Sequence, residues 1–195
     1  MHRFYHETHR FEAGCDEAGR GPLAGPVLAA AVVLPHDFSI PGLNDSKQLS
    51  ESERLDLEIE IKKQSLAWAV AQCTAEEIDR YNILNASILA MHRALDALQI
   101  RPEAILVDGN RFKNYPFIPH YCFVKGDARF ASIAAASILA KNERDRLMKE
   151  LALLYPGYGW ERNMAYPTLE HRKALLRLGP TPEHRKTFKV KEIVL

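Results

Sequence analysis

FEAGCDEAGRGPLAGPVLAAAVVL, residues 11–34, is the stretch that decides the fold class of this 195-residue chain. Residues 11–16 form a short run that ends in a turn rich in glycine and proline, and residues 27–34 are continuously apolar. An apolar run of this length is typical of a strand that is buried on both faces. The stretch therefore predicts two adjacent strands joined by a tight turn, with the carboxylates of Asp16 and Glu17 where the first strand ends.

The rest of the chain alternates between strand and helix patterns, which indicates an α/β domain. Ser50 and Glu53 form a capping box at the start of one predicted helix, and Pro102 follows the end of another. We expect further strands at 66–73, 104–107 and 121–124, and helices at 50–63, 83–100, 132–155 and 168–178. The small residues in the first half of 132–155 predict that this half is the buried one. No repeat or low-complexity linker divides the sequence, so we predict one domain over residues 1–195, with a helical C-terminal region over about 156–195.

Charge is distributed unevenly along the chain. The whole sequence carries 26 Lys and Arg against 25 Asp and Glu, a net charge of +1. Residues 162–191 contain eight basic and two acidic residues, so this stretch carries +6 and the remainder −5. A basic segment of this kind is typical of a protein with a polyanionic partner, although an ordinary solvated helix face can also be basic. Composition alone weighs these two interpretations equally.

Several classes of protein are disfavoured by the sequence. Its longest nearly unbroken apolar run, residues 23–35, is well short of the roughly 20 residues that a membrane-spanning helix needs. The N-terminal segment MHRFYHETHR has no apolar signal core, so we expect a cytosolic protein, with a monomer as the default state. Cys15, Cys73 and Cys122 are widely spaced without a C-x-x-C pair, which predicts reduced, buried thiols rather than disulfides or a zinc site.

Four carboxylates lie at or just after predicted strand ends, and they are Asp16, Glu17, Asp108 and Asp127. Strand ends in an α/β sheet converge on one edge, where ligand sites usually lie. Each residue alone could be an ordinary turn or capping residue. Two carboxylates directly after an apolar strand are costly to bury without a cation, and oxygen-only clusters select Mg²⁺ or Mn²⁺. A pair of such ions could activate water and stabilise a leaving oxygen in phosphodiester hydrolysis.

The glycine-rich segment GRGPLAG, residues 19–25, has two competing interpretations. Gly19, Gly21 and Ala24 formally match the dinucleotide-binding fingerprint, but that fingerprint must open a helix, whereas Pro22 and an apolar strand follow here. A nicotinamide-dependent enzyme is therefore disfavoured. Glycines on both sides of Arg20 suggest exposed backbone amides that a nucleic-acid sugar or phosphate could approach. A tight turn between two strands explains the same composition equally well.

Five segments together carry a resemblance to a known family. They are GCDEAGRGPLAGPV at 14–27, NDSKQL at 44–49, VDG at 107–109, VKGDARFASIAAASILAKNERD at 124–145, and YPGYGW at 155–160 followed by Tyr166, Pro167, Thr168 and His171. In this order and spacing the sequence resembles bacterial ribonuclease HII over residues 11–188. The resemblance implies a ribonuclease H-like mixed sheet flanked by helices, with a small helical C-terminal appendage.

The resemblance also implies an activity and its residues. The family is an endoribonuclease that hydrolyses the RNA strand of RNA/DNA hybrids and cuts 5′ of ribonucleotides embedded in duplex DNA, leaving a 5′-phosphate and a 3′-hydroxyl. Its four metal ligands for two divalent ions, Mg²⁺ or Mn²⁺, correspond to the four carboxylates above. Its Gly-Arg-Gly motif, which senses the 2′-hydroxyl, corresponds to Gly19, Arg20 and Gly21, and its junction-reading tyrosine to Tyr166. A phosphate-contacting loop corresponds to Asn44, Ser46 and Lys47.

Three details of the C-terminal half add to these expectations. Met164 and Ala165 stand where the family often has Lys-Gly, so a positive charge and a flexible glycine are absent before Tyr166. We expect His171 to cover the surface of its helix. We expect Asp145 to pair with a neighbouring basic side chain rather than bind metal. Without the resemblance, Tyr166 is predicted to be a half-buried loop aromatic.

Two other functions compete with the ribonuclease interpretation. A nuclease or recombinase on the same fold would cut DNA, and it would have no use for a loop that reads a 2′-hydroxyl. A non-catalytic module would bind nucleic acid through the basic segment, with strong salt dependence and no requirement for Mg²⁺. Four convergent carboxylates would repel phosphate in such a module.

Overall fold

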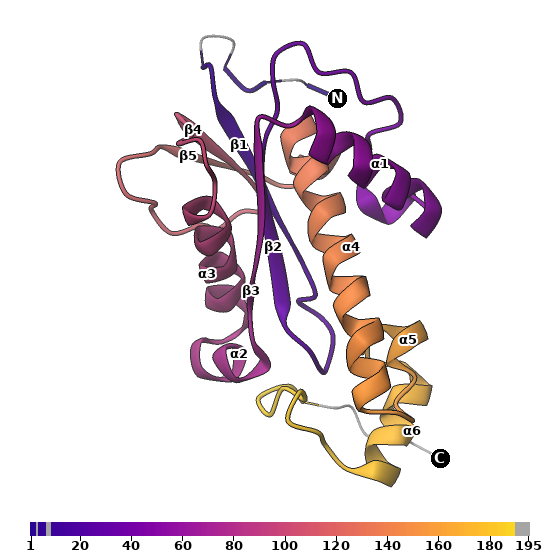
Figure 1. Ribbon diagram of the computed structural model, residues 1–195. Helices are drawn as coiled ribbons and strands as arrows, with labels where there is room; N and C mark the ends of the chain where they lie inside the picture. The colour runs from indigo at the N-terminus through magenta and orange to yellow at the C-terminus, as the bar shows by residue number, and fades with distance from the viewer. Residues whose placement is uncertain (3, 7–8, 190–195) are drawn as a thin grey trace.

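A mixed five-stranded sheet forms the centre of the molecule. The computed structural model describes residues 1–2, 4–6 and 9–189, and the sheet has the order β3-β2-β1-β4-β5 (Figure 1). The pairs β1–β2 and β2–β3 are antiparallel, whereas β1–β4 and β4–β5 are parallel. The strands are β1 (Glu12–Ala18), β2 (Val27–Val33), β3 (Ala67–Cys73), β4 (Ala104–Asp108) and β5 (His120–Phe123). The predicted α/β class and mixed sheet are confirmed.

Helices cover both faces of the sheet (Figure 1). On one side α3 packs against β2 and β3, and on the other α4 packs against β1 and β2, with α1 outside it. The helices are α1 (Glu51–Gln64), α2 (Ala75–Tyr81), α3 (Ile83–Asp96), α4 (Ala131–Leu154), α5 (Trp160–Asn163) and α6 (Leu169–Leu178). Two short 3-10 helices, η1 (Ser46–Gln48) and η2 (Gly126–Ala128), lie in connections. This arrangement buries the central strands β1, β2 and β4, whereas the edge strands β3 and β5 are partly exposed.

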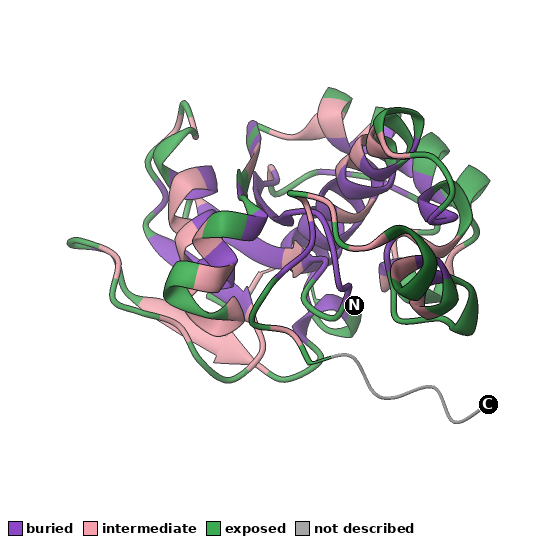
Figure 2. Ribbon diagram, turned by 90° about the horizontal axis from the view of Figure 1, so that it is seen from below, coloured by how far each residue is buried: buried purple, intermediate pink, exposed green. Residues whose placement is uncertain are grey.

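The apolar run of β2 serves two cores at once. Ala29, Ala31 and Val33 pack in the core beneath α3, whereas Ala30 and Val32 pack in the core beneath α4 and α1. Successive side chains of a strand point to opposite faces, so a strand between two helical layers must be apolar at every position. Figure 2 shows the buried residues along the strands and on the helix sides that face them.

Helix α4 lies unusually close to β1 because of one glycine. A Cβ atom added at Gly14 would lie 2.1 Å from the carbonyl carbon of Ser132 and 2.3 Å from the backbone nitrogen of Ile133. Both are backbone atoms of the first turn of α4. The first half of α4 is the buried half, as its small residues predict, and side chains larger than hydrogen at position 14 do not fit.

The C-terminal helices α5 and α6 pack on the second half of α4 and form a separate small core. Trp160 and His171 are fully buried in this part of the molecule, and the indole Nε1 of Trp160 donates to Nε2 of His171 at 2.9 Å. The prediction that His171 covers the helix surface is therefore wrong. A neutral imidazole can be buried here because both of its ring nitrogens have hydrogen-bond partners.

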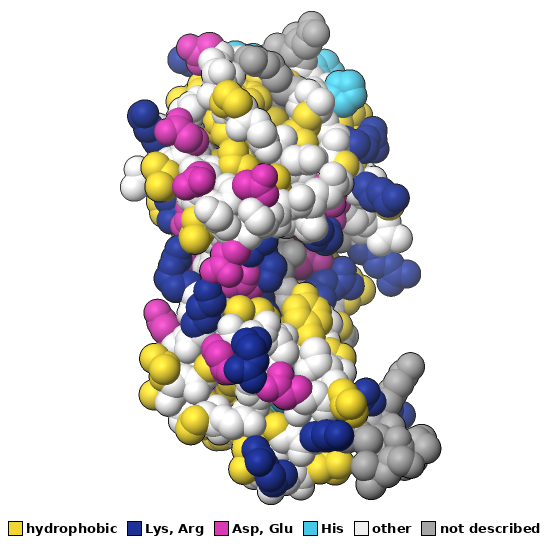
Figure 3. All heavy atoms as spheres, turned by 90° about the vertical axis from the view of Figure 1, so that its right-hand side faces the viewer, with side chains coloured by type: hydrophobic (Ala, Val, Ile, Leu, Met, Phe, Trp, Pro, Cys, Tyr) yellow, Lys and Arg dark blue, Asp and Glu magenta, His cyan; other side chains and the backbone are white. Residues whose placement is uncertain are grey.

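Other predictions fare differently. Helix α1 begins with the predicted capping box, and Asp145 pairs with Lys141, as expected, and also with Arg54. Figure 3 shows charged side chains of both signs gathered at the waist between α1 and the C-terminal helices. Helix α3 ends at Asp96, four residues before the predicted end, and neither α2 nor α5 was predicted.

The remaining exclusions concern cysteines and membranes. Cys15 and Cys73 are buried, Cys122 is half-buried, and all three are free thiols. Within the ranges that the structure describes, no helix has both the length and the apolar character needed to span a bilayer. Lys191, at the end of the basic segment, lies outside the described residues.

Candidate active site

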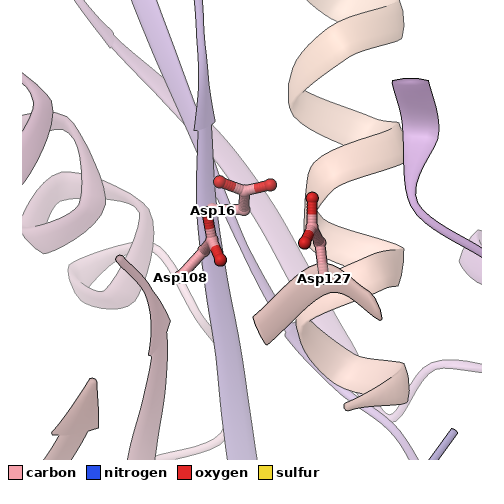
Figure 4. Close-up of side chains that lie close together, drawn as sticks. All are labelled: Asp16, Asp108 and Asp127. Atoms are coloured by element: carbon pink, nitrogen blue, oxygen red, sulfur yellow. The ribbon is translucent and has the colours of Figure 1, made fainter. Parts of the chain in front are cut away.

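Three aspartates meet at one edge of the sheet. Asp16 lies on β1, Asp108 ends β4 and Asp127 lies in η2, and each offers an oxygen within 4.8 Å of those of the other two. Figure 4 shows the three carboxylates facing one another. The parallel register pairs Cys15 with Val107, so the next residue of each strand, Asp16 and Asp108, arrives at the same level. We call these three residues the aspartate cluster.

Backbone hydrogen bonds hold each carboxylate of the aspartate cluster. The backbone N–H of Glu17 donates to Oδ1 of Asp16 at 2.7 Å, and that of Gly126 donates to Oδ1 of Asp108 at 2.7 Å. The N–H of Ala128 donates to Oδ1 of Asp127 at 3.0 Å. All three bonds are accepted by Oδ1, and Oδ2 of Asp127 accepts from Nζ of Lys47 at 3.0 Å.

The fourth predicted ligand, Glu17, lies beside the aspartate cluster rather than within it. Its Oε1 accepts from Nη1 of Arg20 at 3.0 Å. Glu17 and Asp108 both line a cavity of about 290 Å³ that also contains Asp16, the Gly-Arg-Gly loop (residues 19–21), and Tyr166. The structure therefore places three of the four predicted carboxylates, the glycines and the tyrosine around one cavity, and Asp127 adjoins it through the aspartate cluster.

The aspartate cluster is electrostatically costly as it stands. Burial, together with the charges of Glu17 and Asp108, raises the pKa of Asp16 well above its usual range. Burial also raises the pKa of Glu17, against the opposing charge of Arg20, and burial together with Asp127 raises the pKa of Asp108. These shifts share one origin, because desolvation and mutual repulsion both disfavour the ionised form. A divalent cation between the carboxylates would remove the repulsion.

The donor set fits a hard divalent ion. The aspartate cluster offers only carboxylate oxygens, with no His or Cys among the described residues of the group, and such sets select Mg²⁺ or Mn²⁺. Asp16 and Asp127 are 3% and 2% exposed, so their charge is shielded from water. Asp16, Asp108 and Asp127 are thus the residues of this chain that could hold a metal, with Glu17 next to them.

The loop containing Asn44, Ser46 and Lys47 reaches the site through one charged side chain. Nζ of Lys47 lies 3.0 Å from Oδ2 of Asp127. Although burial opposes it, the hydrogen bond and charge of Asp127 raise the pKa of Lys47. Ser46 is buried with its hydroxyl 2.8 Å from that of Ser137, whereas the amide of Asn44 donates to Gln48 and does not line the cavity.

Two polar cavity residues were not predicted from the sequence. Ser137 and Lys141 both line the cavity from α4, and Ser137 also hydrogen-bonds Asp16. Residues four apart lie on the same face of a helix, so this spacing is the signal that could have found them. Identifying which face of α4 meets the strand ends requires the tertiary structure.

The cavity has two edges. The carboxylates form the first, and the second carries the Gly-Arg-Gly loop and Tyr166. Gly19 adopts a φ of +96°, and a Cβ there would meet Nε of Arg144 at 2.1 Å. A Cβ at Gly21 would lie 3.6 Å from the ring of Tyr166, which is 43% exposed. Met164 and Ala165 both have positive φ angles, 48° and 62°, so the family's glycine at position 165 matches a backbone shape that this chain adopts with alanine.

Comparisons with known proteins agree with this geometry. The chain matches the family model for ribonuclease HII over residues 13–191. It is 61% identical over 184 residues to ribonuclease HII of Parabacteroides distasonis, covering 94% of this chain and 92% of the relative. The corresponding protein of Porphyromonas gingivalis is 57% identical over 178 residues, covering 91% and 89%.

Solved structures share the fold. Ribonuclease H2 of Pyrococcus horikoshii matches with a TM-score of 0.77 and 27% identity, covering 92% of this chain and 94% of that one. RNase HII of Archaeoglobus fulgidus, solved in a complex with PCNA, matches with a TM-score of 0.77 and 26% identity, covering 95% and 98%. The fold, the family match and the identity to these relatives together show that the chain belongs to the ribonuclease HII family and is a ribonuclease of the RNase H type.

Proposed function

We propose that this chain is a divalent-metal-dependent endoribonuclease that hydrolyses the RNA strand of RNA/DNA hybrids and cuts 5′ of ribonucleotides embedded in duplex DNA. The expected products carry a 5′-phosphate and a 3′-hydroxyl. The observation that carries the proposal is the aspartate cluster, two members of which (Asp16 and Asp108) line the same cavity as the Gly-Arg-Gly loop. The first is suited to phosphodiester hydrolysis, and the second to recognition of a ribose. We also propose that the protein acts on this substrate as a cytosolic monomer.

The carboxylates would hold the metal. We assign Asp16, Asp108 and Asp127 to metal binding, with Glu17 completing the ligand set for two ions. When bound, Mg²⁺ or Mn²⁺ supplies a nucleophilic water and stabilises the leaving oxygen of the phosphodiester. Lys47, whose side chain is 73% exposed at its ion pair with Asp127, is placed to neutralise a substrate phosphate. Ser46 would support this loop through Ser137, and Asn44 would act only at its outer edge.

Ribonucleotide recognition would come from the second edge of the cavity. The 2′-hydroxyl distinguishes RNA from DNA, and backbone groups of Gly19, Arg20 and Gly21 can hydrogen-bond to it. Tyr166 borders Gly21, so its ring can pack against the sugar that follows the ribonucleotide. A ring packed against this sugar favours a deoxyribose at that position, which accounts for a preference for the RNA-to-DNA junction.

Exposed basic side chains of the C-terminal part would bind the flanking duplex. Arg162 is engaged with Glu161 and Glu170. In the part of the chain that the structure describes, four other basic residues are exposed and make no ion pair. They are Lys173, Arg177, Lys186 and Lys189. Phosphate contacts from such residues give affinity without reading sequence, and they make binding salt-dependent.

The test is cleavage of a labelled DNA duplex with one ribonucleotide, beside an all-DNA duplex of the same sequence. Each is incubated with Mg²⁺, with Mn²⁺ and with chelator. We expect a metal-dependent cut 5′ of the ribonucleotide and no cut in the control, and Asp16→Asn should stop cleavage while the variant still binds the duplex. Cleavage of both duplexes would indicate a DNA nuclease. Binding without cleavage under either metal would indicate a non-catalytic module.

A further inference from the structure

Two arginines lie buried behind the Gly-Arg-Gly loop without a carboxylate partner. Arg144 is 1% exposed and Arg185 is 3% exposed, and neither forms an ion pair with any residue that the structure describes. Burial lowers the pKa of Arg144 to about 10, and burial together with the charge of Arg144 lowers that of Arg185 to about 9, so both remain charged at neutral pH. Two unpaired buried charges are expensive, which suggests that they have a task.

The guanidinium of Arg185 binds the carbonyls of the loop. Its Nη2 donates to the carbonyl oxygen of Gly19 at 2.6 Å, and its Nη1 donates to that of Arg20 at 3.0 Å. Its Nε donates to the carbonyl of Gly25 at 3.0 Å, beyond the loop. Arg144 supports the same region, with contacts to the carbonyls of Ala24, Pro26 and Met164.

This contact decides where the loop's N–H groups point. In a planar trans peptide the C=O and the following N–H point in opposite directions. With the carbonyls of Gly19 and Arg20 turned toward the buried guanidinium, the N–H groups of Arg20 and Gly21 are turned away from it. No hydrogen bond from either N–H to another described residue is present, and both residues line the cavity. Two free donors are thereby presented where a ribose would lie.

His184, which precedes Arg185 in the sequence, acts on Tyr166. Its Nδ1 accepts from the backbone N–H of Thr181 at 2.9 Å, so its proton is on Nε2, which lies 3.2 Å from Nε2 of His171. Nε2 of His171 accepts from Trp160 and shares its single lone pair with the more distant N–H of His184, so the proton of His171 is on Nδ1. That N–H donates to the carbonyls of Ala165 and Tyr166, at 3.1 Å each. The chain of hydrogen bonds thus ends at the backbone of Tyr166.

We propose that His184 and Arg185 are positioning residues that set the two ribonucleotide-reading elements, Arg185 by orienting the N–H groups of Arg20 and Gly21 and His184 by holding Tyr166 through His171. The inference rests on the proposed function and deepens it. Asp16 and Asp108 lie on the sheet and Asp127 lies in η2, whereas the Gly-Arg-Gly loop is oriented by Arg185, more than 150 residues away in sequence. Selectivity for a ribonucleotide is therefore separable from metal binding.

The first experiment measures discrimination in binding. In the Asp16→Asn background, which we expect not to cut, fluorescence anisotropy gives the dissociation constants for the duplex with one ribonucleotide and for the all-DNA duplex. The 2′-hydroxyl should give the parent about a tenfold preference, as expected for one or two hydrogen bonds. Arg185→Lys keeps the charge but cannot donate to both carbonyls through a planar guanidinium. The preference for the ribonucleotide duplex should therefore fall to less than about twofold, while the affinity for the all-DNA duplex stays unchanged.

A matched control separates orientation from charge and from folding. Lys186→Met removes a positive charge one residue along from an exposed side chain, and it should weaken binding to both duplexes equally without changing the preference. Arg185→Gln serves as a second variant if Arg185→Lys fails to fold, because the amide can still donate to one carbonyl. For the two Arg185 variants, unchanged all-DNA affinity certifies that the protein is folded.

The second experiment tests His184 with single-turnover cleavage. His184→Phe keeps a buried ring but removes the donor, so it should slow cleavage at a single embedded ribonucleotide about tenfold more than cleavage of a long hybrid. In the double variant with Tyr166→Ala the two effects should not add, because both act through Tyr166.

Each outcome decides something. A folded Arg185→Lys or Arg185→Gln variant that retains the tenfold preference would overturn the role of Arg185, and additive effects of His184→Phe and Tyr166→Ala would overturn that of His184. A parent protein that binds both duplexes equally would overturn the proposed function and this inference together.

Discussion

Replacing Gly14 by alanine should push α4 away from β1. The new Cβ would lie 2.1 Å from the carbonyl carbon of Ser132, 2.3 Å from the nitrogen of Ile133 and 2.5 Å from the carbonyl oxygen of Ser132. Carbon atoms in contact normally lie about 3.5–4.0 Å apart, so the first turn of α4 must retreat by more than about 1 Å. Overpacking of this kind costs about 3 kcal/mol, which for a chain of this length lowers the melting temperature by about 6–12 °C.

The same displacement should reach the aspartate cluster. The backbone N–H of Phe130, at the start of α4, donates to the carbonyl of Gly126 at 2.8 Å, and Asp127 lies in that turn. A retreat of α4 therefore draws Asp127 away from Asp16, and the affinity for Mn²⁺ should fall. Differential scanning calorimetry measures the first effect, and isothermal titration with Mn²⁺ measures the second.

Gly42→Ala is the matched control for this substitution. Gly42 has a φ of +82° and no atom within 4 Å of a built Cβ, so alanine there meets backbone strain alone, about 1 kcal/mol. It should leave Mn²⁺ affinity unchanged. A Gly14→Ala protein that melts within about 2 °C of the parent and binds Mn²⁺ equally well would refute the packing argument.

Three further predictions concern the site and the C-terminal part. Tyr166→Ala should slow cleavage at single embedded ribonucleotides about tenfold more than cleavage of long hybrids, with unchanged Mn²⁺ affinity; equal loss on both substrates would contradict the junction role. Mn²⁺ at 100 times its dissociation constant should stabilise the protein by about 2.7 kcal/mol in calorimetry, and Asp16→Asn should abolish this gain. Burial, together with the charge of His171, lowers the pKa of His184 to about 4, so between roughly pH 6.5 and 4 the unfolded chain binds a proton that the folded chain excludes. Stability should therefore be complete above that window and fall as the pH drops through it, by up to about 2 kcal/mol at pH 5 in urea unfolding, and His184→Phe should remove this part of the loss.

Local patterns predicted most of the fold. A run such as residues 27–34 is typical of a strand that is buried on both faces, and β2 does occupy the middle of three antiparallel strands. Helix α2 was missed because residues 75–81 bury only Ala75 and Ile78, too few for a visible periodicity. Its capping box, Thr74 with Glu77, was the available signal.

The site was predictable only in part, since sequence gives positions along strands but not contacts between them. The sequence predicted that Asp16 and Asp108 lie at one edge of the sheet because strand ends in an α/β sheet converge there. The placement of Ser137 behind Asp16 and the burial of His171 depend on how α4 and the C-terminal helices meet the sheet. No periodicity within one element encodes such contacts.

The two edges of the cavity are built by different parts of the chain, and this has a consequence for how the enzyme tolerates change. The aspartate cluster depends on the register of β1 with β4 and on the close approach of α4 at Gly14. The Gly-Arg-Gly loop and Tyr166 depend on Arg185 and His184, which contact no member of the aspartate cluster through any hydrogen bond in the described residues. Changes in the C-terminal part should therefore alter which sugar is accepted before they alter metal binding, whereas changes along β1 and in the first half of α4 should do the reverse.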